Sequence, residues 1–70
     1  MDYREAQQER AELVSRTFAL ITAKLEDAAA LAAQSQGRQP LDALRKNAEK
    51  LREILVETAT VADCVTVLLS

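Results

Sequence analysis

Apolar residues recur through the first half of the chain at alternating steps of three and four residues. The positions are Ala11, Val14, Phe18, Ile21, Leu25, Ala28 and Ala32, called here the first heptad row. This spacing keeps all members on one face of an α-helix, whereas a strand would require strict alternation. The pattern predicts a helix over residues 2–36, roughly 50 Å long from the helical rise per residue.

The second half of the chain repeats the same spacing. The second heptad row is Leu41, Leu44, Ala48, Leu51, Leu55, Thr58, Ala62, Val65 and Leu69, and it predicts a helix over residues 40–69. Many residues after position 54 are β-branched, so a strand at Val65–Leu69 is the alternative. The sustained helical period favours the helix, because intrinsic propensity is a weak guide against such a pattern.

A turn at residues 37–39 separates the two predicted helices. The chain has one glycine, Gly37, and one proline, Pro40. Glycine accepts the left-handed backbone that often ends a helix, and proline suits the first turn of the next one. Asp2 and Glu5 have the spacing of a capping box at the start of the chain. The prediction is a single all-α domain over residues 1–70: an antiparallel, coiled-coil-like helical hairpin whose two heptad rows face each other.

Further apolar residues lie beside the heptad rows. Leu13 and Leu20 each precede a member of the first row, and Ile54, Val61 and Leu68 recur every seven residues beside the second. A second apolar stripe is what a helix needs when it contacts two neighbours in a four-helix bundle. We therefore predict that these five residues form the contact between two hairpins. The alanines near the turn (Ala28, Ala29, Ala32 and Ala33) should let that end close within one chain.

The length of the chain favours association. Seventy residues are close to the size at which a single chain struggles to bury enough apolar surface. We predict a non-enzymatic protein–protein interaction module that homodimerises. The alternative is a small chaperone or adaptor that docks its apolar face on a different, helical protein. In length and layout the chain resembles the small helical-hairpin co-chaperones of type III secretion needles, and that resemblance would imply such a role.

The charges give a weaker alternative. Five of the nine cations lie in and just after the turn, at Arg38, Arg45, Lys46, Lys50 and Arg52. The build is also similar to that of Rop-like plasmid copy-number regulators, and this resemblance would imply RNA binding by a dimer through these cations. Against nucleic acid, the net charge is −2, acidic residues are interleaved with the cations, and no aromatic residue lies nearby to stack on a base.

No residue pattern points to catalysis or to a cofactor. The chain has no histidine that could act as a base for Ser15, Ser35 or Ser70, and no glycine-rich phosphate loop. Glu49, Glu53 and Glu57 recur every four residues and could in principle hold a cation, although a solvated helix face is favoured. The sequence predicts neither an enzyme nor a bound metal or cofactor.

Cys64 and the lengths of the apolar runs give an expectation for the cellular location of the protein. A lone cysteine excludes an internal disulfide, fits a reducing environment and is expected here as a small, partly buried side chain. The longest apolar run, Ala28–Ala33, is far shorter than the ~20 residues of a membrane span. The charged residues after Met1 are unlike a signal peptide, so the cytoplasm is the expected location.

Overall fold

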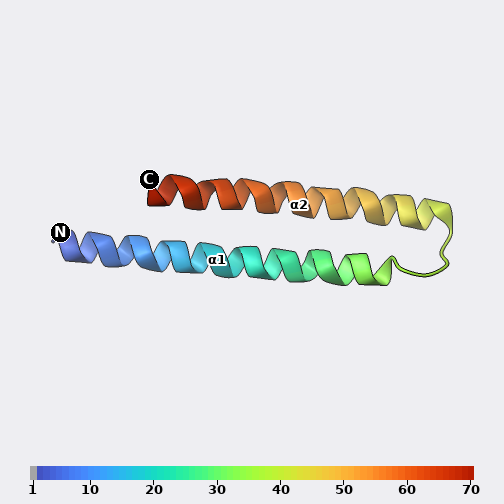
Figure 1. The fold of residues 1–70 in the computed structure, drawn as a ribbon, viewed down its shortest axis with the longest axis horizontal. Helices are drawn as coiled ribbons and strands as arrows, with labels where there is room; N and C mark the ends of the chain where they lie inside the picture. Colours follow the sequence, from blue (N-terminus) through green and yellow to red (C-terminus); the bar gives the residue numbers. More distant parts are fainter. Residues whose placement is uncertain (1) are drawn as a thin grey trace.

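The computed structural model describes residues 2–70, which form two α-helices, α1 (Tyr3–Gln34) and α2 (Leu41–Leu69). The helices lie side by side and antiparallel, and the N-terminal end of α1 extends beyond the end of α2 (Figure 1). The hairpin is a thin rod with extents of 58 × 16 × 13 Å. The predicted all-α helical hairpin is therefore confirmed.

Polar side chains define both ends of α1. Asp2 is the N-cap, and its carboxylate accepts a hydrogen bond from the Arg4 backbone N–H at 3.5 Å. The helix ends at Gln34, two residues earlier than predicted, and Ser35 is the C-cap. The Ser35 hydroxyl donates to the Leu31 carbonyl at 2.7 Å, and the Gln39 side-chain amide donates to the Gln34 carbonyl. The Leu31 carbonyl also accepts from the Ser35 backbone N–H, whereas the Gln39 amide supplies a partner for the Gln34 carbonyl at the end of the helix.

Glycine occupies the turn as the sequence predicts, whereas the proline lies just before the second helix and not in its first turn. Gly37 has φ +97°, which only glycine adopts without strain. Pro40 is extended, with φ −58° and ψ 144°, so it precedes α2 as the N-cap instead of opening the helix. Its carbonyl accepts from the Leu44 backbone N–H at 3.1 Å. The helix then continues to Leu69, and the alternative of a strand at its end is wrong.

The contact between the helices, called here the seam, is rotated relative to the heptad rows. On α1 the seam residues are Val14, Thr17, Ile21, Lys24, Ala28, Leu31 and Ser35. On α2 they are Leu44, Asn47, Leu51, Ile54, Thr58, Val61, Val65 and Leu68. Every second member of each heptad row belongs to the seam, and the members between them are exposed. The prediction that the two heptad rows face each other is therefore only half right.

The seam gives the hairpin very little core. Among residues 2–70 only Ala28, Thr58 and Val65 are buried, with 5%, 7% and 5% of their surfaces exposed. No large side chain in that range is fully buried. Two helices that contact each other along one stripe cannot enclose a side chain on all sides, because each helix has a single neighbour. A hairpin built in this way leaves many of its large apolar residues exposed.

Candidate protein interface

The exposed members of the heptad rows form one continuous surface, called here the apolar face. On α1 it consists of Ala11, Phe18, Leu25 and Ala32, and on α2 of Leu41, Ala48, Leu55, Ala62 and Leu69. Its large side chains are exposed to 53% at Phe18, 47% at Leu25, 75% at Leu41, 45% at Leu55 and 61% at Leu69. Large apolar side chains repeated along a whole face are the pattern of an interaction surface, unlike single exposed leucines.

Both rows of the apolar face lie on the same side of the hairpin. Seven of the nine members directly follow a seam position, as Leu25 follows Lys24 and Leu55 follows Ile54, and Ala11 and Leu41 extend the same rows by the seven-residue repeat. One residue is a rotation of about 100° in the same sense on each helix. Because the helices run in opposite directions, this rotation turns both rows to the same side.

Two polar contacts across the seam fix which residues are level with each other. The Lys24 ammonium donates to a Glu57 carboxylate oxygen at 2.9 Å, and the Asn47 side-chain amide donates to the Ser35 hydroxyl at 3.1 Å. A step toward the C-terminus on α1 corresponds to a step toward the N-terminus on α2. Leu25 is therefore level with Leu55 to within one to two residues. By the same register, Phe18 is level with Ala62, and Ala32 with Ala48.

The opposite side of the hairpin, called here the charged flank, has different chemistry. Asp27, Gln34 and Lys50 line a shallow depression there, beside the Lys24–Glu57 ion pair. Leu13 and Leu20 lie on this same side, because they precede Asp27 by fourteen and seven residues on α1. Each is 48% exposed. The large exposed apolar side chains Leu13 and Leu20 on this flank thus lie toward the open end of the hairpin, beyond Asp27.

The five residues predicted as the contact between hairpins do not gather on one exposed surface. Ile54, Val61 and Leu68 are half-buried in the seam, against α1. Leu13 and Leu20 are exposed on the charged flank. The role of the five between two hairpins stays a prediction, but three of them already serve the fold of a single chain. The apolar face is the larger surface that the sequence assigned to the inside of the hairpin.

The five cations near the turn are spread around the hairpin. The Arg45 guanidinium lies 3.8 Å from the Asp42 carboxylate, and Lys50 lies on the charged flank. Arg52 borders the apolar face, beside Ala48 and Leu55. Arg38 and Lys46 are exposed, in the turn and in the first part of α2. Cations that point to different sides give no single positive surface for a nucleic-acid backbone.

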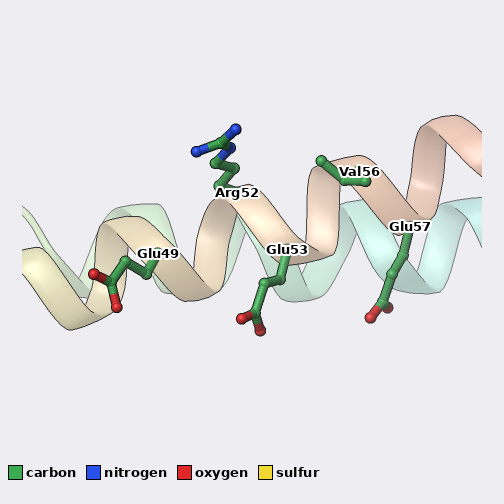
Figure 2. Close-up of a pocket in the computed structure, with 5 residues that line it drawn as sticks. All are labelled: Glu49, Arg52, Glu53, Val56 and Glu57. Carbon is green, nitrogen blue, oxygen red and sulfur yellow. The ribbon is translucent and has the colours of Figure 1, made fainter.

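The three glutamates of α2 line its solvent side. Figure 2 shows the Glu49, Glu53 and Glu57 carboxylates projecting to one side of the helix, away from Arg52 and Val56, around an open depression. Glu57 pairs with Lys24. Within residues 2–70, no three His, Cys, Asp or Glu side chains come close enough together to hold a metal ion.

The structure corrects the expectation for Cys64. The side chain is exposed, not partly buried, and the thiol is free. Together with Thr60, Asp63, Val67 and Leu68 it lines a depression on the outer side of α2, near the open end of the hairpin. Cys64 precedes the buried Val65 by one position, and this rotation turns it away from the seam.

No family model matches the chain, and no curated protein or solved structure is significantly similar to it. Over residues 2–70, neither helix combines the length and apolar character needed to cross a membrane.

Proposed function

We propose that this protein is a non-enzymatic interaction module that homodimerises through its apolar face to form a four-helix bundle. The observation that carries the proposal is the rotation of the heptad rows away from the seam. Both rows turn toward the same side of the hairpin, and that side bears the exposed large residues Phe18, Leu25, Leu41, Leu55 and Leu69.

The size of the rotation matches the geometry of a bundle. At about 100° per residue, the middle of each heptad row lies about 50° around its helix from the middle of the seam. In a square arrangement of four helices, the direction from one helix to the bundle axis lies about 45° from the direction to either neighbour. The strongest apolar stripe of each helix thus points where the centre of a four-helix bundle would be.

The dimensions of the face also suit a stable dimer. The helices overlap along α2, whose 29 residues give a length of about 44 Å. With the 16 Å width of the hairpin, the outline of this side is about 700 Å² per copy. Specific interfaces bury about 800 Å² of accessible surface per partner, so this side is large enough for a contact of standard size.

Two neighbouring side chains allow a matched test. Leu55 and Val56 are both exposed apolar residues of α2, at 45% and 58%; Leu55 belongs to the apolar face, whereas Val56 borders it from the outer side of the helix. The native chain should sediment as a dimer, at twice 7.7 kDa. Leu55→Lys places two charges in the contact, one per copy, and should raise the dissociation constant at least 100-fold by sedimentation equilibrium. Val56→Lys should leave the dissociation constant within about threefold, since a factor of ten already requires about 1.4 kcal/mol.

The result also separates homodimer from adaptor. Equal effects of Leu55→Lys and Val56→Lys on a native dimer would contradict the apolar face as its contact. A native chain that is folded but monomeric at high concentration would contradict the homodimer. It would instead favour the alternative in which the same face docks on a different helical protein.

A further inference from the structure

We infer that the two hairpins of the dimer pack with their turns at opposite ends, so that Leu25 and Leu55 of both copies surround the two-fold axis. This inference rests on the proposed homodimer. Two hairpins that join their apolar faces by two-fold symmetry have two simple arrangements. If the two-fold axis runs parallel to the helices, the turns of the two copies lie at the same end of the dimer. If the two-fold axis runs perpendicular to the helices, from α1 toward α2, the two turns lie at opposite ends.

The α2 row of the apolar face is symmetric about its central residue. Its members alternate large and small in the order Leu41, Ala48, Leu55, Ala62, Leu69. With turns at opposite ends, α2 runs antiparallel to α2 of the second copy. Leu55 then meets Leu55 of the second copy, Ala48 meets Ala62, and Leu41 meets Leu69. A row that reads the same in both directions pairs in register with itself, as a two-fold contact requires.

The α1 row of the apolar face is compatible with a two-fold axis at the same level. Leu25 is level with Leu55, so four leucines meet at the axis. Seven residues to either side, Phe18 of one copy meets Ala32 of the other. Placing a large residue against a small one is how facing layers fill the space between helices.

The same-end arrangement packs these residues less evenly. Each level would then meet the same level of the second copy, so Ala32 and Ala48 of both copies would form a layer of four alanines. The neighbouring layer would hold four leucines, and the next would hold both phenylalanines of the dimer. An all-alanine layer beside an all-leucine layer leaves unfilled volume, which destabilises a core. With turns at opposite ends, each of the two alanine-rich layers receives one Phe18.

A distance between the two turns distinguishes the arrangements. Arg38 is exposed in the turn and lies outside the apolar face. We would attach a nitroxide to Arg38→Cys in a Cys64→Ser background and measure the distance between copies by pulsed electron paramagnetic resonance. Turns at opposite ends should give about 45 Å, because 14 residues of α2, about 21 Å, separate Leu55 at the axis from Leu41 next to each turn. Turns at the same end should give less than about 25 Å, a few helix diameters.

A second label provides the control. Val56→Cys, also in the Cys64→Ser background, lies at the level of the axis on the outer side of α2 and should give a short distance in both arrangements. A short distance at both positions in an intact dimer would overturn the opposite-end arrangement and leave the homodimer standing. A folded monomer with no distance between copies at either position would overturn the homodimer and, with it, the arrangement.

Discussion

The Lys24 ammonium on α1 lies 2.9 Å from a Glu57 carboxylate oxygen on α2 and forms the only ion pair between the two helices within residues 2–70. Lys24 occupies a seam position, with 25% of its side chain exposed, and Glu57 lies at the edge of the charged flank, with 62% exposed. Together with the bond between Asn47 and Ser35, this pair shows which residues of the two helices are level with each other. Polar side chains therefore take part in a seam that has almost no buried core.

Glu57→Gln should lower the free energy of unfolding by about 0.3–1 kcal/mol, because an ion pair this exposed is well screened by water. Raising the salt concentration should shrink the loss further. Urea unfolding at low and high salt measures both effects. Glu53→Gln, one turn earlier on the same helix, removes an equal charge that has no ion-pair partner. Equal losses for the two variants at low salt would show that the Lys24 contact does not stabilise the hairpin.

Ile54→Ala and Leu20→Ala compare the stability contributions of a seam residue and a charged-flank residue. The sequence predicts both residues for the contact between hairpins. Ile54 is half-buried against α1, so its truncation should cost about 1–2 kcal/mol, below the 2–5 kcal/mol of a full core site. Leu20 is 48% exposed and should cost less than about 0.5 kcal/mol. Urea unfolding at one fixed protein concentration gives both values. If Leu20→Ala strongly lowered the free energy of unfolding and also weakened the dimer, the contact between hairpins would involve the residues predicted from sequence.

Gly37→Ala tests the turn. A Cβ at this position would meet no atom within 4 Å, so the substitution is sterically free. The cost should come from the backbone alone, because φ is +97° and L-residues pay about 1–2 kcal/mol to adopt the left-handed region. Gln36→Ala is the control, since it changes an exposed neighbour whose φ is not positive. Thermal or urea unfolding of Gly37→Ala that matched the control would mean that the turn relaxes to another conformation.

The periodicity predicted the helices well, and it did not predict the seam. Both the seam and the heptad rows follow steps of three and four residues, and they share members such as Ile21 and Leu51. The heptad rows are more apolar, so the sequence pattern predicts them on the inside of the hairpin. The seam instead includes Thr17, Lys24 and Asn47, which a pattern of hydrophobicity counts against it.

The same difference moves the candidate interface. Hydrophobicity alone places the heptad row against α1 and leaves Ile54, Val61 and Leu68 as a second stripe beside it. Once the helix is rotated by part of a turn, these residues lie in the seam and the heptad row becomes the surface. A wrong rotation therefore exchanges the inner and outer stripes of a helix without changing where the helix begins or ends.

The sequence by itself determined the two helices, the turn at Gly37 and the existence of more apolar surface than one hairpin can bury. These features depend on local backbone preferences and on the helical period, which are properties of neighbouring residues. The tertiary structure alone decided which stripe of each helix is inside. That choice depends on partners distant in the chain, since Lys24 reaches Glu57 and Ser35 meets Asn47 only across the seam. In this arrangement the most apolar stripe of both helices lies outward, on the side where the proposed second copy would pack.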